Sequence, residues 1–305
     1  MRSSLIFVIY GAVLFILAAP AAATSPVVVA SKIDTEGALL ANMILSVLAA
    51  HDIPVRNRLQ LGPTNIVRAA ILAGQIDIYP EYTGNGALFF HKDTDLVWKS
   101  RQGGYGEIAK LDLAGNRLVW LTPAPANNTW VVAVRHDLAQ RAGLATMSDF
   151  ARYVNAGGQI KLAASAEFFE SPSALPAFEA SYGFRLSDRQ LLTLSGGNTS
   201  ATLRAAAEGM SGVNAAMAYG TDGAIAALGL VALEDDKGAQ IVYAPAPVIR
   251  EATLKQYPQI AGLVDPVFAS LTLATLQRLN AEIAVDGGDA GAVAMSYLKS
   301  KHFLP

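Results

Sequence analysis

The stretch that decides the fold is residues 27–79, VVVASKIDTEGALLANMILSVLAAHDIPVRNRLQLGPTNIVRAAILAGQIDIY. It contains three short runs, at 27–30, 55–59 and 76–79, that are able to form strands. Two helical patterns separate the three runs. Three strands and two helices within about 55 residues predict a parallel βαβαβ sheet, because parallel neighbours need a crossover helix between them.

The two helices are predicted from the spacing of apolar residues and from their end signals. Leu39, Met43 and Val47 recur at four-residue steps, and Asp34 stands where it can cap the first helix. The second helix is expected over 64–73, with its threonine as the cap and the glycine that follows as its stop.

The alternation of strands and helices continues through the middle of the chain. Strands are expected at 130–134, 160–162 and 213–218, and helices at 173–181 and 199–208. The whole chain is therefore expected to be an α/β protein in which helices cover mostly parallel strands.

Two proline-rich joints interrupt this pattern, at Pro123-Ala124-Pro125 and at Pro245-Ala246-Pro247. Both are short and lie between expected strands, so we interpret them as crossings between two lobes rather than as flexible linkers. After the second joint, residues 251–301 are expected to be mostly helical.

The overall composition narrows the class of protein. Of the 305 residues, 52% are hydrophobic and 16% are charged, and the formal net charge is −2. The apolar fraction suffices for a large core. The chain lacks the basic surface of a nucleic-acid-binding protein, so no nucleic-acid partner is expected. It has no cysteine, which excludes disulfides, thiolate metal ligands and cysteine nucleophiles.

The first 23 residues have the pattern of a secretory signal peptide. Arg2 precedes an apolar run at 5–17, and Pro20-Ala21-Ala22-Ala23 provides small residues for cleavage. An uncleaved membrane anchor is the alternative. Because no cysteine follows the run, a lipid anchor is excluded, and the mature chain is expected to be free in the periplasm.

The sequence carries no recognisable catalytic or metal-binding motif. Its four histidines are scattered, and it has no nucleophile elbow, phosphate loop or dinucleotide fingerprint. Asp77 and Glu81 are more consistent with turn and backbone contacts than with a catalytic pair. The segment 195–199 has two interpretations: it binds an anion at a helix N-terminus, or it is only a turn that caps the helix. The pattern favours a binding protein without metal or cofactor over an enzyme.

Aromatic and small polar residues instead gather where strands are expected to end. The segment 79–86, YPEYTGNG, follows the third strand, and ligands of parallel sheets bind at the carboxyl ends of strands. Further aromatic residues stand in 127–130, NNTW, and in 218–222, AYGTD, and Tyr243 comes just before the second proline-rich joint.

These segments, in this order, resemble the substrate-binding proteins of osmoprotectant ABC importers, which take up glycine betaine, choline, carnitine and related compounds. The resemblance covers 27–303 and includes Ser31-Lys32 and 234–238, EDDKG. It implies a two-lobed periplasmic binding-protein fold of type II with two chain crossovers and a ligand cleft between the lobes. The first lobe would comprise 24–126 plus 226–305, and the second 127–225.

The resemblance also implies the site and the partners. By motif position, an aromatic cage around a quaternary ammonium would consist of Tyr82, Trp130, Tyr219 and Tyr243. Lys32 and Asn85 would face the carboxylate of the ligand. Asn128 would orient the cleft or serve a turn. The protein would be a monomer that delivers its ligand to an ABC permease in the inner membrane.

This chain departs from the family pattern at three positions. It has Trp130 where the family usually has tyrosine, and Asn85 where threonine is common. Many members carry arginine after the Glu-Phe motif, whereas here 167–170, EFFE, is followed by Ser171. Loss of a bidentate arginine weakens the binding of a zwitterion more than the binding of choline, because choline has no carboxylate. We therefore predict modest betaine affinity or a preference for other quaternary amines. A secreted hydrolase or lyase on a related scaffold is the competing hypothesis.

Overall fold

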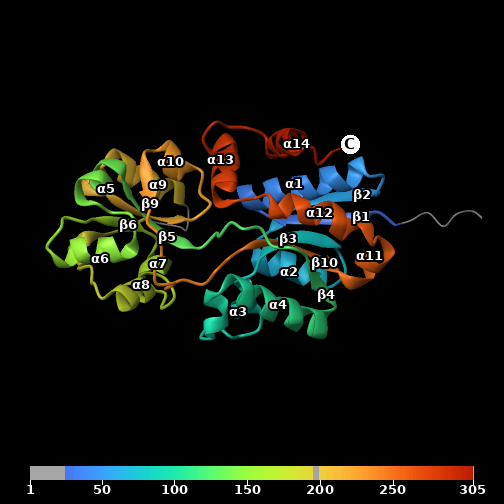
Figure 1. The fold of residues 1–305 in the computed structure, drawn as a ribbon, viewed down its shortest axis with the longest axis horizontal. Coiled ribbons are helices and arrows are strands. Elements are labelled where there is room, and N and C mark those ends of the chain that lie inside the picture. Colours follow the sequence, from blue (N-terminus) through green and yellow to red (C-terminus); the bar gives the residue numbers. More distant parts are fainter. Residues whose placement is uncertain (1–24, 195–198, 305) are drawn as a thin grey trace, which may run out of the picture.

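The computed structural model describes residues 25–194 and 199–304. The expected signal peptide, 1–23, and residues 195–198, part of the segment considered for anion binding, lie outside the described residues. The described chain forms two lobes, each built on a five-stranded mixed sheet, and two segments run between them (Figure 1).

The first sheet confirms the predicted parallel βαβαβ unit. Its strand order is β2-β1-β3-β10-β4, with β1 parallel to β2 and to β3, and β10 antiparallel to β3 and β4. The strands are β1 (Val27–Lys32), β2 (Val55–Gly62), β3 (Ile78–Tyr82), β4 (Leu118–Trp120) and β10 (Pro245–Arg250).

Helices cover both faces of the first sheet, because successive strand residues point to opposite faces. Val29 and Ile78 pack into one core with the helices of one face, whereas Ala30 and Tyr79 pack into a second core on the other. The helices of the first face are α1 (Thr35–Ala50), α11 (Glu251–Gln256), α12 (Gln259–Ala269), α13 (Leu273–Ala284) and α14 (Ala290–Ser300). Those of the other face are α2 (Thr64–Leu72), α3 (Asn85–Phe89), the 3₁₀ turn η1 (Leu96–Lys99) and α4 (Arg101–Asn116).

The second lobe repeats this three-layer plan. Its strand order is β7-β6-β8-β5-β9. The strands are β5 (Trp130–Arg135), β6 (Leu162–Ala164), β7 (Leu191–Thr193), β8 (Ala215–Tyr219) and β9 (Leu230–Ala232). One face carries α5 (His136–Ala142), α6 (Met147–Asn155), α7 (Ala166–Glu170) and α8 (Leu175–Tyr182), and the other α9 (Thr199–Glu208) and α10 (Ala224–Ala227). The 3₁₀ turns η2 (Asp188–Gln190) and η3 (Met210–Gly212) lie in connections.

Of the two predicted helix caps, one is confirmed and one is wrong. The Asp34 carboxylate accepts a hydrogen bond from the Gly37 backbone at 2.6 Å and caps α1 as predicted. In α2, Thr64 is the first helical residue and Pro63 is the cap, so the predicted cap is wrong by one residue. Gly74 follows α2 with φ +69°, a conformation that suits glycine.

The second proline-rich joint is a strand, which corrects its interpretation as a crossing. Residues 245–250 form β10, which lies between β3 and β4 in the first sheet. Pro245 and Pro247 lack N–H donors, but their carbonyl groups accept from the backbones of Ala124 and Leu121. The donors that face β3 come from the intervening residues, so the ladder tolerates both prolines.

The expected return to the first lobe at residue 226 is wrong. Strand β9 pairs with β5 and therefore belongs to the second sheet. The acidic run after β9 also stays in the second lobe, because the Asp235 carboxylate accepts from the Tyr182 hydroxyl at 2.5 Å and from the Gln240 backbone at 2.8 Å. Long-range pairing thus carries the second lobe to about residue 240.

Within the described ranges, no single helix is long and apolar enough to span a membrane. The helices α12 and α13 meet that criterion of length and composition only together, and they are bent by 88° at their break.

Candidate functional site

Two segments cross between the lobes, and they are bonded to each other. The Asn128 backbone donates to the Tyr243 carbonyl at 2.9 Å, and the Thr129 hydroxyl donates to the Ile241 carbonyl at 2.7 Å. In return, the Tyr243 backbone donates to the Asn127 side chain at 2.8 Å. The functional residues predicted from the sequence lie on these segments or at the ends of strands, except Asn85, which begins α3.

The glycines of 218–223, AYGTDG, allow backbone to approach backbone at this junction. A Cβ atom on Gly220 would lie 2.4 Å from the Asn127 carbonyl oxygen of the first crossing segment. A Cβ atom on Gly223 would lie 2.1 Å from the backbone nitrogen of Ala281 in α13. Only glycine fits at both positions, so the segment after β8 packs directly against the first crossing segment and against α13.

Trp130 and Tyr219 form a stacked pair. They are direct cross-strand neighbours in the antiparallel β5–β8 ladder, and their ring centroids lie 4.4 Å apart at 25°. Phe168 in α7 contacts the Trp130 ring edge-on at 5.4 Å. Trp130 therefore has one face covered by Tyr219 and is also contacted by Phe168.

Tyr243 packs over the loop after β3. A Cβ atom on Gly84 would lie 2.7 Å from two carbons of the Tyr243 ring. The YPEYTG motif therefore needs its glycine to seat this ring. Tyr243 lies on the second crossing segment, whose carbonyl at this residue accepts from the Asn128 backbone of the first.

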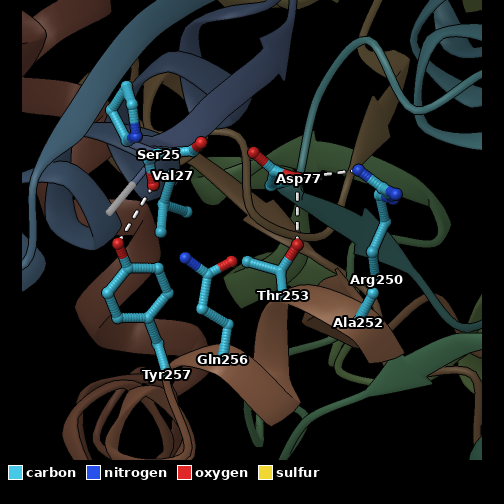
Figure 2. Close-up of a pocket in the computed structure, with 9 residues that line it drawn as sticks. Ser25, Val27, Asp77, Arg250, Ala252, Thr253, Gln256 and Tyr257 are labelled. Atoms are coloured by element: carbon cyan, nitrogen blue, oxygen red, sulfur yellow. Dashed lines mark hydrogen bonds and ion pairs between the residues drawn. The ribbon is translucent and has the colours of Figure 1, made fainter. Parts of the chain in front are cut away.

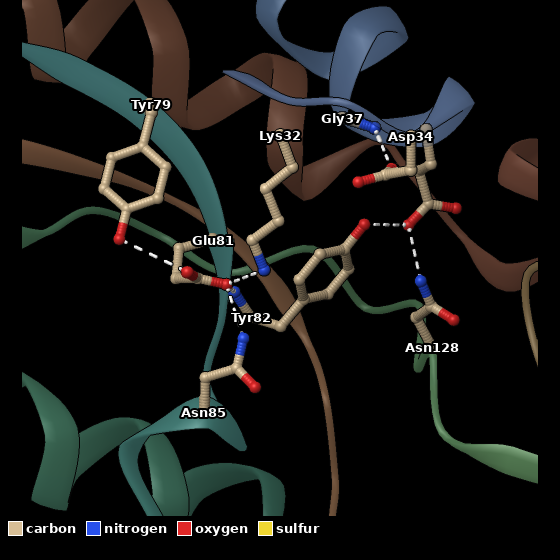
Figure 3. A network of polar contacts seen from close by, with 9 residues as sticks. Lys32, Asp34, Gly37, Tyr79, Glu81, Tyr82, Asn85 and Asn128 are labelled. Atoms are coloured by element: carbon tan, nitrogen blue, oxygen red, sulfur yellow. Dashed lines mark hydrogen bonds and ion pairs between the residues drawn. The ribbon is translucent and has the colours of Figure 1, made fainter. Parts of the chain in front are cut away.

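Tyr82 lies on β3 rather than in the loop where the sequence placed it, because the strand extends to this residue. The Lys32 ammonium sits over its ring, 4.6 Å from the centroid, and its hydroxyl donates to Glu36 at 2.8 Å. Figure 3 shows the ring of Tyr82 between these contacts. One face of this predicted cage wall is thus already occupied by a protein cation.

Lys32 and Asn85, the two residues expected to face a ligand carboxylate, are both bound to Glu81. Lys32 forms an ion pair with Glu81, and both side chains are buried. The Asn85 amide donates to the same carboxylate oxygen at 2.7 Å, and the Tyr82 backbone donates to it at 2.8 Å (Figure 3). The Tyr79 hydroxyl donates to the other oxygen at 3.2 Å. The carboxylate of Glu81 therefore neutralises the charge of Lys32.

Glu36 is the residue of this site that sequence reasoning missed. It lies in the first turn of α1 and is buried. Its carboxylate accepts from Tyr82, from the Asn128 amide at 3.2 Å and from the Asn280 amide at 2.6 Å. The only signal for Glu36 in the sequence is its position in the first turn of a helix. An acidic residue there is normally explained by its favourable interaction with the helix dipole at the protein surface. Asn128 lies on the first crossing segment, and its amide thus binds the buried carboxylate of Glu36.

Acidic groups surround the aromatic side chains. Burial raises the pKa of Tyr82, Tyr219 and Tyr243, and nearby carboxylates raise each pKa further. For Tyr219 these carboxylates include Glu167 and Asp34. All three rings therefore stay neutral phenols at neutral pH, and burial also raises the pKa of Glu36.

Two cavities lie away from these rings. One, of about 180 Å³, is lined by Asp77 and Arg250 near the start of β1 (Figure 2). Asp77 accepts there from the Val28 backbone at 2.9 Å, from Arg250 at 3.0 Å and from the Thr253 hydroxyl at 2.9 Å. The structural interpretation of Asp77 is confirmed. The other cavity, of about 290 Å³, lies between α1 and the start of α14.

Comparison with known proteins identifies the family. The model of the family described as the substrate binding domain of ABC-type glycine betaine transport system matches residues 25–300. The chain belongs to this family. The fold class is confirmed, since its solved relatives are two-lobed binding proteins of type II.

Individual members of this betaine-transport family are similar over nearly the whole chain. The glycine betaine-binding protein YehZ of Escherichia coli K12 is 60% identical over 282 residues, which cover 92% of each chain. A glycine-betaine-binding protein of Pseudomonas aeruginosa is 29% identical over 283 residues, covering 90% of this chain and 88% of that protein. The structure of apo YehZ from Escherichia coli has a TM-score of 0.85 at 59% identity and covers 92% of this chain and 100% of the other.

Family membership decides between the two hypotheses that the sequence left open. The relatives are substrate-binding proteins of ABC transporters and not enzymes. The competing hypothesis of a hydrolase or lyase finds no support among them. Relative to the family pattern, Ser171 ends α7 and its hydroxyl shares a hydrogen bond of 3.0 Å with Ser173. No guanidinium stands at this position.

Proposed function

We propose that the protein binds a quaternary ammonium osmoprotectant, such as glycine betaine or choline, between its lobes. The ligand is delivered to an ABC permease in the inner membrane. The working protein is a periplasmic monomer without a lipid anchor, released by cleavage after the signal peptide 1–23. The observation that carries the proposal is the stacked pair of Trp130 and Tyr219 beside the first crossing segment. Tyr82 and Tyr243 would supply the other rings.

The chemistry of the ligand class fits such a group. A trimethylammonium carries charge but has no N–H to donate, so a carboxylate is unable to hydrogen-bond it. Aromatic faces attract the charge and cover the methyl groups, each contributing about 0.5–2 kcal/mol. Four rings would contribute about 2–8 kcal/mol, of the order needed for micromolar binding.

The crossing segments supply the hinge. The first runs from the end of β4 to Thr129, where the sequence expects it, and the second comprises 241–244. Their mutual hydrogen bonds let both segments bend as a unit. Closure of the lobes about this pair would bring Tyr219 of the second lobe towards Tyr82 and Tyr243.

Titration calorimetry tests the proposal. Wild-type protein should bind glycine betaine or choline, with a change in tryptophan fluorescence because Trp130 is one of the rings. The uncharged choline isostere 3,3-dimethyl-1-butanol should bind at least ten-fold more weakly, since it lacks the charge that the rings attract. Equal binding of choline and this isostere, or binding of neither betaine nor choline, would contradict the proposal.

A further inference from the structure

One buried carboxylate joins the predicted ligand wall to both lobes. Glu36 is 6% exposed. One of its oxygens accepts from the Tyr82 hydroxyl at 2.8 Å and from the Asn128 amide at 3.2 Å. The other accepts from the Asn280 amide at 2.6 Å.

These partners come from the first lobe and from the first crossing segment, and one of them contacts the second lobe. Tyr82 lies on β3 of the first lobe, Asn128 on the first crossing segment, and Asn280 on α13. Thr221 follows β8 of the second lobe, and its carbonyl accepts from Asn280 at 2.9 Å. The carboxylate therefore binds three segments that are distant in the sequence, and Asn280 extends the link to the Thr221 segment of the second lobe. All of these donors are neutral groups.

The contacts of Tyr82 show what this arrangement does. The ring is held at its hydroxyl by Glu36 and on one face by the Lys32 ammonium. A ring that is fixed at its hydroxyl and on one face presents only its remaining face for a ligand. Its orientation is thus set before a ligand enters, which lowers the entropy lost on binding.

We propose that Glu36 is a positioning residue for the ligand site: it orients the ring of Tyr82 and ties that ring to the first crossing segment and to the second lobe. This inference rests on the proposed function, because it assigns the residue that prepares one wall of that site. Glu36 itself does not contact the ligand.

The side chains around Glu36 suggest which substitutions are informative. The Oδ1 atoms of Asn128 and Asn280 are buried and have no hydrogen-bond partner. In Glu36→Gln, the retained side-chain oxygen still accepts from Tyr82, and the new amide nitrogen takes the place of the oxygen that accepts from Asn280. Asn280 has to turn its amide for its unpartnered Oδ1 to accept from that nitrogen, and in doing so it gives up its bond to the Thr221 carbonyl. Glu36→Gln should therefore fold and keep the ring in place. Glu36→Ala removes the acceptor and should free the ring.

A double-mutant cycle between Glu36→Ala and Tyr82→Phe is the test, with affinity for choline and glycine betaine measured by calorimetry. Glu36→Ala alone should weaken binding about ten-fold, which equals about 1.4 kcal/mol. In the Tyr82→Phe background the same substitution should change affinity less than two-fold, because the hydroxyl through which Glu36 acts is absent. Glu36→Gln should restore affinity to within about three-fold of wild type.

A buried carboxylate elsewhere provides the control. Glu179 in α8 is 8% exposed and accepts from the Leu186 backbone at 3.0 Å. Glu179→Ala should lower the unfolding midpoint without changing ligand affinity. If Glu36→Ala weakens binding by the same factor with and without the Tyr82 hydroxyl, Glu36 does not act through this ring and the inference is wrong.

A second readout is independent of the ligand. Crystal structures of the ligand-free variants should show the Tyr82 ring displaced in Glu36→Ala and retained in Glu36→Gln. An unchanged ring in Glu36→Ala would overturn the inference. If wild type bound no quaternary amine at all, the proposed function would fail, and the ring position would still decide the role of Glu36.

Discussion

Replacing Glu81 with glutamine should make the site select for a ligand carboxylate. In the wild type, Lys32 and Glu81 form a buried ion pair, with side chains 8% and 0% exposed. A ligand carboxylate that approaches Lys32 also approaches Glu81. The attraction of that carboxylate to Lys32 and its repulsion from Glu81 largely cancel, so the ion pair adds little to the binding free energy of a zwitterion.

The magnitude follows from the charges. Two unit charges 4 Å apart interact by about 4 kcal/mol at an effective dielectric constant of about 20. Glu81→Gln removes the repulsive member and leaves Lys32 buried without a partner. The protein should lose about 3–5 kcal/mol of stability. A ligand carboxylate would restore the missing partner, so the preference for glycine betaine over choline should rise at least ten-fold, about 1.4 kcal/mol.

Calorimetry with both ligands measures this ratio, and urea denaturation measures the stability. Glu107→Gln is the matched control, because Glu107 forms an ion pair with Lys92 at 2.7 Å on the surface of the same lobe. It should leave the betaine-to-choline ratio unchanged. If Glu81→Gln folds poorly, Lys32→Met combined with Glu81→Gln should recover stability but not the preference for betaine.

The reasoning fails if Glu81→Gln binds both ligands with the wild-type ratio, or shifts the ratio towards choline. Either result would mean that Lys32 does not face the ligand carboxylate. Equal stability of Glu81→Gln and wild type would show that the ion pair contributes nothing to folding.

Three other predictions concern the rings, the lobe junction and pH. Tyr219→Ala removes the ring stacked on Trp130 and should weaken choline binding by about 1–3 kcal/mol in calorimetry, whereas Tyr219→Phe should bind like wild type; equal loss in both would refute the ring's role. Gly223→Ala places a Cβ atom 2.1 Å from the backbone of α13 and should cost about 1–3 kcal/mol in urea denaturation; the matched Gly262→Ala, with open space at its Cβ, should not destabilise. Hydrogen bonds from two backbone N–H groups lower the pKa of Asp149 from 3.8 to about 2. Its stabilisation is therefore present above the usual pKa and lost as pH falls towards 2. The thermal midpoints of Asp149→Asn and wild type should differ at pH 7 and converge at pH 2, and a constant difference would contradict this.

Much of the secondary structure follows from local sequence. The helix predicted at 199–208 has the same bounds as α9, and Asp34 caps α1 through a bond within its own turn. Such features depend on residues three or four positions apart, so apolar spacing and capping residues are sufficient to predict them. The aromatic residues at strand ends are also visible in the sequence, because their position relative to the strands is local.

Tertiary structure decided the features that depend on distant residues. Pro245 and Pro247 form a strand because β3 and the end of β4 flank them, although isolated prolines favour a joint. Lys32 forms an ion pair with Glu81, which is 49 residues away in the sequence. Glu36 accepts hydrogen bonds from residues up to 244 positions away.

The sequence by itself determined the α/β pattern, the family and the ring residues of the proposed site. Only the folded chain decided which charges are neutralised and which rings have a free face. Burial makes an unpaired charge costly, so each buried ionic group takes the partner that the topology brings to it, and neighbouring residues in the sequence do not reveal that partner.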